Sequence, residues 1–109
     1  MSTLKNPLRT ERPTAEARRL SVRPVPLGRT VATPAVLHAV PILDIMIAME
    51  RHRRHDWGDV SEADWKKNDR ALKIGERLFS AYKSGDDTKF WIITEWDRSV
   101  TMVLLPSDY

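Results

Sequence analysis

Cysteine is absent from this 109-residue sequence, which excludes disulfide bridges and thiolate metal sites. Long apolar runs are missing too: no stretch approaches the roughly 18 apolar residues that a membrane-spanning helix needs. The first residues contain no apolar core of the kind found in secretory signals. We therefore expect a cytoplasmic protein that does not bind membranes. A chain of this length is expected to form one domain with a modest hydrophobic core.

Positive charge is concentrated at the start of the sequence. Residues 1–30 contain seven basic and two acidic side chains, a net charge of +5; the whole chain carries +3, so the remainder is mildly acidic at −2. Four of the seven prolines lie in the first 26 residues, where aromatic residues are absent. This composition predicts a disordered basic arm over residues 1–27, followed by a single domain over residues 28–109. The alternative to a merely solubilising arm is one that attracts an acidic partner such as nucleic acid.

Three helices are expected in the first part of the domain. Thr33 and Pro34 have the residue types of an N-cap and a first helical position, and Pro41 interrupts the apolar run that follows. Farther along, Ser61 opens a capping-box-like segment that Gly75 is suited to end. The expected helices cover about 34–40, 41–54 and 62–74.

The last third of the sequence changes to the composition of β-strands. Turn-forming residues occupy 84–87 and 97–99, and strands joined by tight turns pair antiparallel. A short stretch around Val31 is a further strand candidate. We predict an α+β fold in which two or three helices pack on one face of a three- to four-stranded antiparallel meander. The three strands rich in β-branched and aromatic residues are expected at 77–82, 90–96 and 100–105.

The nearest approach to a metal-binding pattern consists of His52, His55, Asp56 and Asp59. Two histidines three residues apart share a helix face and could supply two ligands, with an acid completing the set. The pattern is weak, and the two arginines between the histidines would repel a cation. We therefore predict no metal and no cofactor, and interpret the histidines as surface groups at a helix end.

Aromatic and basic residues are the best candidates for a binding surface. Alternation along the 90–96 strand puts Trp91 and Trp96 on opposite faces, so one of them is expected to face away from the core. An aromatic ring beside a basic side chain can stack a nucleobase or contact a protein partner. The alternative is that the aromatic residues simply cover the sheet or, for a loop tryptophan, plug the end of the core. The candidate binding residues are Trp57, Arg77, Tyr82, Trp91 and Arg98.

Catalytic patterns are missing from the sequence. No nucleophile, base and orienting group are credibly close, and there is no glycine-rich phosphate loop or pair of carboxylates in an obvious cleft. A binding protein is therefore favoured over an enzyme.

The half of the chain from Asp56 to Tyr109 resembles a known family in several short motifs. These are Asp56-Trp57-Gly58-Asp59, Asn68, Leu72, Gly75, Arg77-Leu78, Ser80-Ala81-Tyr82, Trp91-Ile92-Ile93-Thr94-Glu95, Asp97-Arg98-Ser99, Thr101, Leu104-Leu105-Pro106 and Tyr109. They resemble the small plasmid-related proteins of bacterial plasmids and integrative elements. The glycine that this family has before Asp-Trp-Gly is His55 here, and its alanine before Asp-Arg-Ser is Trp96. The resemblance implies mobile-element biology and carries no activity or binding site with it.

Three functional hypotheses follow, and the third is a purely structural small oligomer. The first is a non-enzymatic accessory protein of a mobile genetic element, which binds a host protein or nucleic acid through the surface around Trp57, Tyr82, Trp91 and Arg98. The second rests on the expected order of elements, which is similar to that of the toxins of the RelE and ParE class.

The similarity to RelE-type toxins implies a ribonuclease that cuts ribosome-bound messenger RNA. In such an enzyme, Arg77, Tyr82, Lys89 and Arg98 would lie on the sheet as the basic and acid–base groups. Similarity of architecture does not carry function by itself, so this stays the alternative hypothesis.

Overall fold

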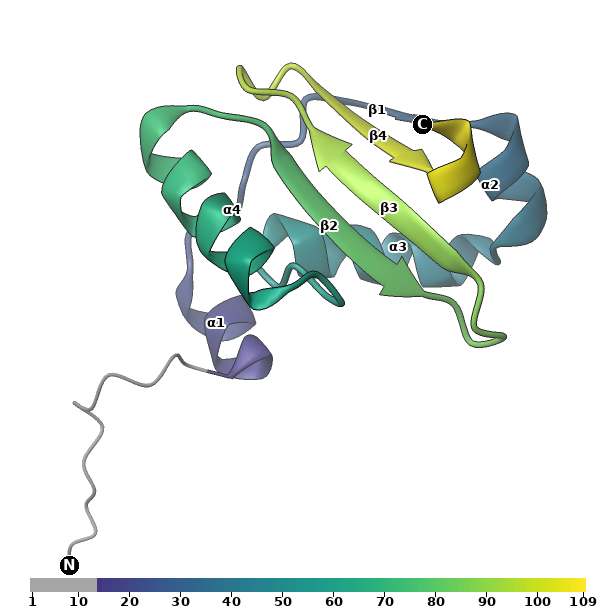
Figure 1. Ribbon diagram of the computed structural model, residues 1–109, viewed down its shortest axis with the longest axis horizontal. Helices are drawn as coiled ribbons and strands as arrows, with labels where there is room; N and C mark the ends of the chain where they lie inside the picture. Colours follow the sequence, from purple (N-terminus) through teal and green to yellow (C-terminus); the bar gives the residue numbers. More distant parts are fainter. Residues whose placement is uncertain (1–13) are drawn as a thin grey trace, which may run out of the picture.

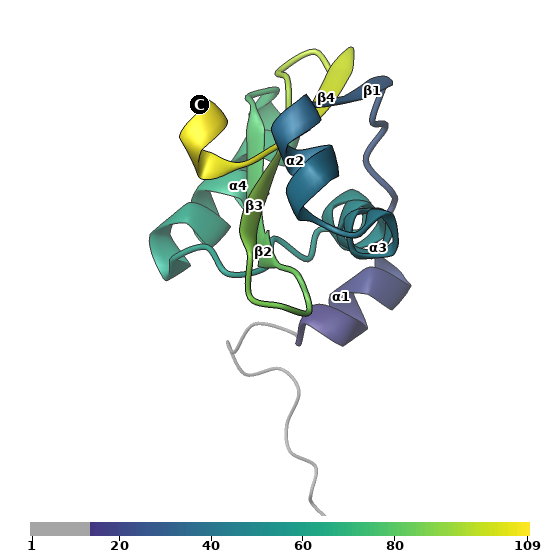
Figure 2. The same cartoon turned by 90° about the vertical axis from the view of Figure 1, so that its right-hand side faces the viewer.

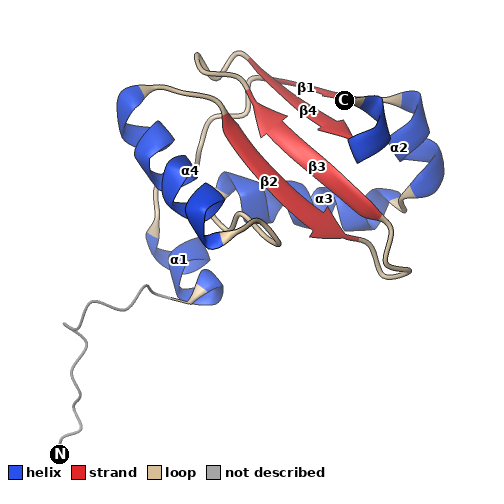
Figure 3. Cartoon of the chain, in the orientation of Figure 1, coloured by secondary structure: helices blue, strands red, loops and turns tan. Residues whose placement is uncertain are grey.

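The computed structural model describes residues 14–109, which form an α+β domain with one four-stranded sheet (Figures 1 and 3). Within this range no helix combines the length and the apolar character needed to cross a membrane. The elements are α1 (Ala15–Ser21), β1 (Arg29–Ala32), α2 (Pro34–Ala39), α3 (Ile42–Arg53), α4 (Glu62–Ile74), β2 (Leu78–Lys83), β3 (Lys89–Thr94), β4 (Val100–Leu104) and the 3-10 turn η2 (Pro106–Asp108).

Local capping sets the bounds of the helices. The Thr33 hydroxyl accepts a hydrogen bond from the Val36 N–H at 3.1 Å, and the Ser61 hydroxyl accepts one from the Asp64 N–H at 3.1 Å. Gly75 ends α4 in the left-handed region at φ 75°, which a glycine adopts without strain. The three predicted helices are therefore confirmed as α2, α3 and α4.

The sheet has the order β1-β4-β3-β2. The pairs β2–β3 and β3–β4 are antiparallel, which confirms the meander. The stretch around Val31 forms β1, but β1 lies parallel to β4, so the prediction of an all-antiparallel sheet is wrong at this edge. The physical reason is the connection: the chain between β1 and β4 includes three helices and two strands, and such a long crossover permits the parallel direction that a hairpin forbids.

The prediction that two or three helices pack on one face of the sheet is confirmed for two of them. The helices α2 and α3 cover one face, whereas α4 runs beside the β2 edge (Figures 1 and 2). Under α4 lies a second small core in which Trp65 and Ala71 pack with Trp57 and Leu78. The main core joins α2 and α3 to the sheet through Val36, Val40, Ile45, Ala48, Tyr82, Phe90, Ile92 and Val103.

The free edge of β2 is closed by one side chain and one loop. The amide of Asn68 donates to the Phe79 carbonyl at 2.7 Å and accepts from the Phe79 N–H at 3.1 Å. Two residues along the strand, the Ala81 carbonyl accepts from the Asp59 N–H and the Ala81 N–H donates to the Trp57 carbonyl. A side chain on Gly58 would meet the Ala81 carbonyl at 2.1 Å, so this close approach requires glycine. The outward backbone groups of Phe79 and Ala81 are thus satisfied where an open edge would invite aggregation.

Residues 14–27 are ordered, so the prediction of a disordered arm is wrong for this part; residues 1–13 lie outside the described residues. Arg18 forms an ion pair with Asp69 at 2.7 Å, and Arg19 forms one with Asp56 at 2.7 Å. Val25 is buried in the second core. Two of the basic side chains that suggested a solvated arm therefore pair with acids of the domain.

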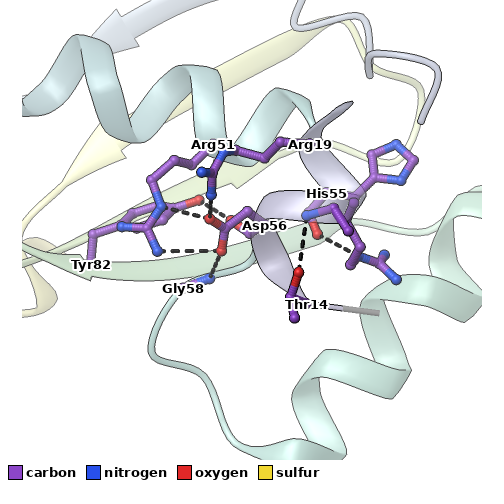
Figure 4. A network of polar contacts seen from close by, with 9 residues as sticks. Thr14, Arg19, Arg51, His55, Asp56, Gly58 and Tyr82 are labelled. Atoms are coloured by element: carbon purple, nitrogen blue, oxygen red, sulfur yellow. Dashed lines mark hydrogen bonds and ion pairs between the residues drawn. The ribbon is translucent and has the colours of Figure 1, made fainter. Parts of the chain in front are cut away.

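Asp56 is a buried charge that joins three segments of the chain (Figure 4). Its carboxylate accepts hydrogen bonds from Arg19 at 2.7 Å, from Arg51 at 2.8 Å and from the Gly58 N–H at 3.2 Å, and its carbonyl accepts one from the Tyr82 hydroxyl at 2.8 Å. Burial alone would raise the pKa of Asp56, but the hydrogen bonds and charge of Arg51, helped by Gly58 and Arg19, hold that pKa below its ordinary value.

Replacing this carboxylate is predicted to destabilise the domain. Asp56→Asn removes the charge but keeps the shape, leaving Arg51 and Arg19 without their counter-ion. We expect the free energy of unfolding to fall by about 3 kcal/mol, as is typical when one partner of a buried ion pair is lost. Urea denaturation measures the change. The matched control is Asp59→Asn, which alters an exposed acid and should stay within about 0.5 kcal/mol; equal losses in the two variants would contradict the prediction.

Candidate functional site: an aromatic groove on the open sheet face

The sheet face opposite α2 and α3 carries a groove. Strand alternation turns Phe79, Trp91 and Ile93 toward this face, and the C-terminal turn η2 lies on the same side (Figure 2). A cleft of about 460 Å³ opens between α4 and Tyr109 over these side chains. A second hollow of about 580 Å³ continues from Phe79 and Trp91 toward the β2–β3 hairpin. We call the two hollows together the aromatic groove.

Three aromatic rings form the floor and one wall of the aromatic groove. Phe79 and Trp91 meet edge to face, with ring centroids 5.0 Å apart and planes at 80°. Trp91 and Tyr109 meet in the same way at 5.7 Å and 69°. Edge-to-face contacts of this kind contribute roughly 0.5–1.5 kcal/mol each beyond simple burial. The Trp91 ring is therefore held in place while remaining half-exposed.

Arg77 holds Tyr109 against this wall. Its guanidinium donates a hydrogen bond to the Tyr109 hydroxyl at 2.8 Å and lies 6.0 Å from the centre of the Tyr109 ring. The same group forms an ion pair with Glu95 at 3.6 Å. Both charged side chains are more than a third exposed, so the pair is a weak link rather than a fixed support.

Charges of both signs surround the aromatic groove. Lys83 and Lys89 are directly opposite each other in the β2–β3 register, and both are exposed. Neither takes part in any ion pair among residues 14–109. Like charges opposite each other on a sheet are unfavourable, so an anion at this end of the groove would relieve the repulsion. A third hollow lies beside the groove, on the other side of Arg77 and Tyr109. The basic residues that line the groove and this third hollow are Lys67, Arg77, Lys83 and Lys89. The acidic residues that line them are Asp59, Asp64, Glu76, Glu95 and Asp108.

The predicted binding residues separate into two groups. Trp91 and Arg77 lie together at the aromatic groove. Trp57 and Tyr82 are instead buried in the core, 0% and 2% exposed. The Trp57 indole N–H donates to Asp69 at 3.1 Å, and burial raises the pKa of Tyr82 above its ordinary value. Trp57 lines neither hollow, whereas Tyr82 lines the second hollow although it is almost fully buried.

Arg98, the fifth predicted residue, binds the backbone. Its guanidinium donates to the carbonyls of Glu76 at 2.6 Å, Glu95 at 3.1 Å and Ala71 at 3.1 Å. Ala71 lies in the last turn of α4, so Arg98 connects the end of that helix to the β3–β4 turn.

The four candidate metal ligands do not converge. His52 is fully buried, which overturns its interpretation as a surface group. His55 bonds the Arg23 carbonyl at 3.0 Å, Asp56 is occupied by arginines, and Asp59 is exposed. Over residues 14–109, no group of three or more histidine, cysteine or acidic side chains could hold a metal ion.

A directed chain of hydrogen bonds passes through His52. Because the Leu27 carbonyl can only accept, the Thr101 hydroxyl donates to it at 2.7 Å and itself accepts from the Thr94 hydroxyl at 2.8 Å. Thr94 therefore accepts from Nε2–H of His52 at 2.8 Å, and Nδ1 accepts from the Ser80 hydroxyl at 2.6 Å. Burial, with repulsion from nearby positive groups, lowers the pKa of His52 to about 3. The neutral imidazole joins α3 to three strands and is part of the core.

Two residues of the groove were missed by sequence reasoning. Phe79 could have been found from alternation in β2, because Leu78, Ser80 and Tyr82 are turned to the core and Phe79 to the other face. Tyr109 gave no such signal, because it reaches Trp91 only through the turn η2.

Comparisons with protein-family models, with curated proteins and with solved structures found no match to this chain.

The two arginines near the groove are predicted to behave differently on substitution. Arg98→Ala leaves three backbone carbonyls without their charged donor, and should lower the free energy of unfolding by about 2 kcal/mol. Arg77→Ala removes an exposed pair and should cost less than about 1 kcal/mol. Urea denaturation of the two variants, side by side, checks this. A larger loss for Arg77→Ala than for Arg98→Ala would be inconsistent with the assignment.

The buried histidine predicts a loss of stability in mild acid. Below its ordinary pKa of 6.5, His52 takes up a proton in the unfolded chain, whereas in the folded protein it does so only near pH 3. Unfolding therefore binds a proton between these values, and stability falls as the pH drops, by at most about 1.4 kcal/mol per pH unit. Urea denaturation from pH 7 to pH 4.5 should show a shallower slope in His52→Gln. His38→Gln, at an exposed histidine of α2, is the control and should keep the wild-type slope.

Proposed function

We propose that this protein is a cytoplasmic, non-enzymatic binding protein that holds an extended segment of a partner protein in the aromatic groove. The observation that carries the proposal is the row of edge-to-face rings of Phe79, Trp91 and Tyr109, lying on the sheet face that α2 and α3 leave open. Aromatic residues fixed in this way provide contact area without a large loss of side-chain entropy on binding.

The charge around the groove favours a protein partner over nucleic acid. A groove for single-stranded nucleic acid combines stacking rings with a continuous basic track for the phosphates. Here the basic residues are mixed with the acids Asp59, Asp64 and Glu76. Within the part of the basic arm that the structure describes, Arg18 and Arg19 are already paired with Asp69 and Asp56. A polypeptide, which carries apolar, acidic and basic groups together, fits this mixture better.

The residues at the two ends of the groove suggest the chemistry of the segment. An aromatic or large aliphatic side chain would contact the faces that Phe79 and Trp91 leave exposed. At the hairpin end, Lys83 and Lys89 form an unpaired like-charge couple that one carboxylate would neutralise. We therefore propose a segment in which an apolar anchor is followed within a few residues by an acid.

The biological setting of the proposal comes from the resemblance of residues 56–109 to plasmid-related proteins. That resemblance implies an accessory protein of a mobile genetic element, so the proposed partner is a protein of the bacterial host. The ribonuclease alternative has less support, because two of its four residues are engaged elsewhere: Tyr82 is buried and Arg98 binds backbone carbonyls.

The proposal predicts which peptides the protein selects. A library of random dodecapeptides, panned on the full chain, should be enriched in sequences that combine an aromatic or large aliphatic residue with a nearby acid. Synthetic peptides from this pool should bind Trp91→Ala at least about 10-fold more weakly than wild type, because a central aromatic anchor is lost. Lys83→Glu with Lys89→Glu should remove the preference for the acid and retain the preference for the apolar residue. Fluorescence anisotropy of labelled peptides measures both effects.

Trp96→Ala is the matched control. Trp96 is 64% exposed and does not line the aromatic groove, so its loss should leave peptide affinity unchanged. The proposal fails if no peptide is enriched, or if Trp96→Ala weakens binding as much as Trp91→Ala. It also fails if a 20-nucleotide RNA binds the groove more tightly than the peptides do. Growth arrest on expression that depends on Arg77 would favour the ribonuclease instead.

A further inference from the structure

The outer side of α2 and α3 carries a second apolar surface, which the aromatic groove does not involve. Five large apolar side chains are each more than half exposed: Leu37 at 52%, Ile42 at 58%, Leu43 at 66%, Met46 at 58% and Ile47 at 61%. We call these five residues the α2–α3 patch. Scattered apolar side chains are common on protein surfaces, but here five of them lie within eleven residues on two consecutive helices.

The core does not explain the α2–α3 patch. The helix α3 meets the sheet through Ile45, Ala48 and His52, and these complete its buried side. A helix on the surface of a globular domain carries polar residues on its outer side, whereas one that is apolar all round is covered on both sides. The first half of α3 carries one charged side chain, Asp44, whose carboxylate accepts a hydrogen bond from the Gly85 N–H at 3.0 Å. Ile42, Leu43, Met46 and Ile47 make the outer side of this half apolar, and they are exposed to solvent.

We propose that the α2–α3 patch is the interface of a homodimer, in which two α3 helices pack antiparallel about a twofold axis near Met46 and Ile47. The charges of α3 support this arrangement. Glu50, Arg53 and Arg54 form ion pairs with each other at the C-terminal end of the helix, away from the patch. Antiparallel packing places this charged cluster at opposite ends of the interface in the two copies. The apolar residues then meet in the middle, and no like charges face each other.

The size of the α2–α3 patch agrees with a weak dimer. Five side chains exposed to this extent present on the order of 500 Å² per copy, so about 1,000 Å² in total would be buried. Specific interfaces begin near this value, and stable ones bury roughly 1,200–2,000 Å². A bilayer surface is a poorer occupant, because membrane-binding helices carry rows of unpaired basic residues beside their apolar side. Here Arg53 and Arg54 are both paired with Glu50.

The lack of cysteine permits a direct test with single-cysteine variants of the full chain. Facing residues of packed helices come close enough for a disulfide when they lie at the axis of symmetry. Ile47→Cys should therefore form a cross-linked dimer on mild oxidation. The control is Ile74→Cys, which changes an apolar residue of similar exposure on α4 and should stay monomeric.

Charge substitution tests the symmetry. Analytical ultracentrifugation should show concentration-dependent dimers of the wild type and only monomers of Ile47→Glu and of Ile47→Lys. Each substitution should weaken the affinity of dimerisation at least about 100-fold. Mixing these two variants should restore a dimer, because residue 47 of one copy faces the same region of the other. Circular dichroism confirms that the variants are folded.

Three results would overturn the proposal. The first is a wild type that stays monomeric at millimolar concentration. The second is a mixture of the Glu and Lys variants that remains monomeric. The third is an Ile47-dependent binding to phosphatidylglycerol vesicles by a monomeric wild type, which would assign the α2–α3 patch to a membrane surface.

Discussion

The buried carboxylate of Asp56 is the constraint on which the rest of the structure depends. Removing an ionised carboxylate from water costs several kcal/mol, and it is tolerated only when charged and polar partners are placed around it. Those partners come from α1, α3 and the loop itself, as Arg19, Arg51 and the Gly58 N–H. The loop is thereby held against the strands. This seats Trp57 in the core and brings Gly58 within contact of β2, so one charge connects the N-terminal segment, the helix layer and the edge of the sheet.

Closing the β2 edge determines which surface remains for function. Asn68 and the loop after Asp56 satisfy the backbone of β2, and α2 and α3 cover one face of the sheet. The opposite face keeps its apolar residues, and their rings are ordered by one another and by Arg77. A sheet that needed this face only for stability would gain nothing from Lys83 opposite Lys89. In the proposed function, the acid of the bound segment would reduce this cross-strand repulsion at the end of the aromatic floor.

Local signals allowed most of the helices and strands to be predicted, whereas long-range pairing could not be. Thr33, Ser61 and Gly75 act within a few residues, so the sequence around them was sufficient to bound α2 and α4. The parallel direction of β1 depends on how β4 is oriented beside it at the end of a long crossover. No local sequence pattern encodes that orientation. No local pattern predicts the order of residues 14–27 or the burial of His52 either. The acids that pair with Arg18 and Arg19, and the hydroxyl groups that bond His52, lie 28 to 51 residues away along the chain. Of the groove, Trp91 and Arg77 were predicted from residue type and strand alternation, but their assembly with Tyr109 required the fold.

The helices α2 and α3 lie on the opposite side of the sheet from the turn η2 (Figure 2). The aromatic groove lies on the side of η2 and the α2–α3 patch on the outer side of the two helices, so the two proposed contacts do not compete. A dimer formed through α3 would turn its two grooves outward, in opposite directions. A partner with two suitable segments, or two copies on one assembly, would then be held at both grooves, and the second contact would form at an effective concentration near the millimolar range. Dimerisation would raise the affinity for such a bivalent partner by some factor. By thermodynamic linkage, the bound partner would raise the affinity of dimerisation by the same factor. Two surfaces that each bind weakly can in this way give one complex of high affinity. This suits a small domain, which needs most of its apolar residues for its own core and has few left for a large interface.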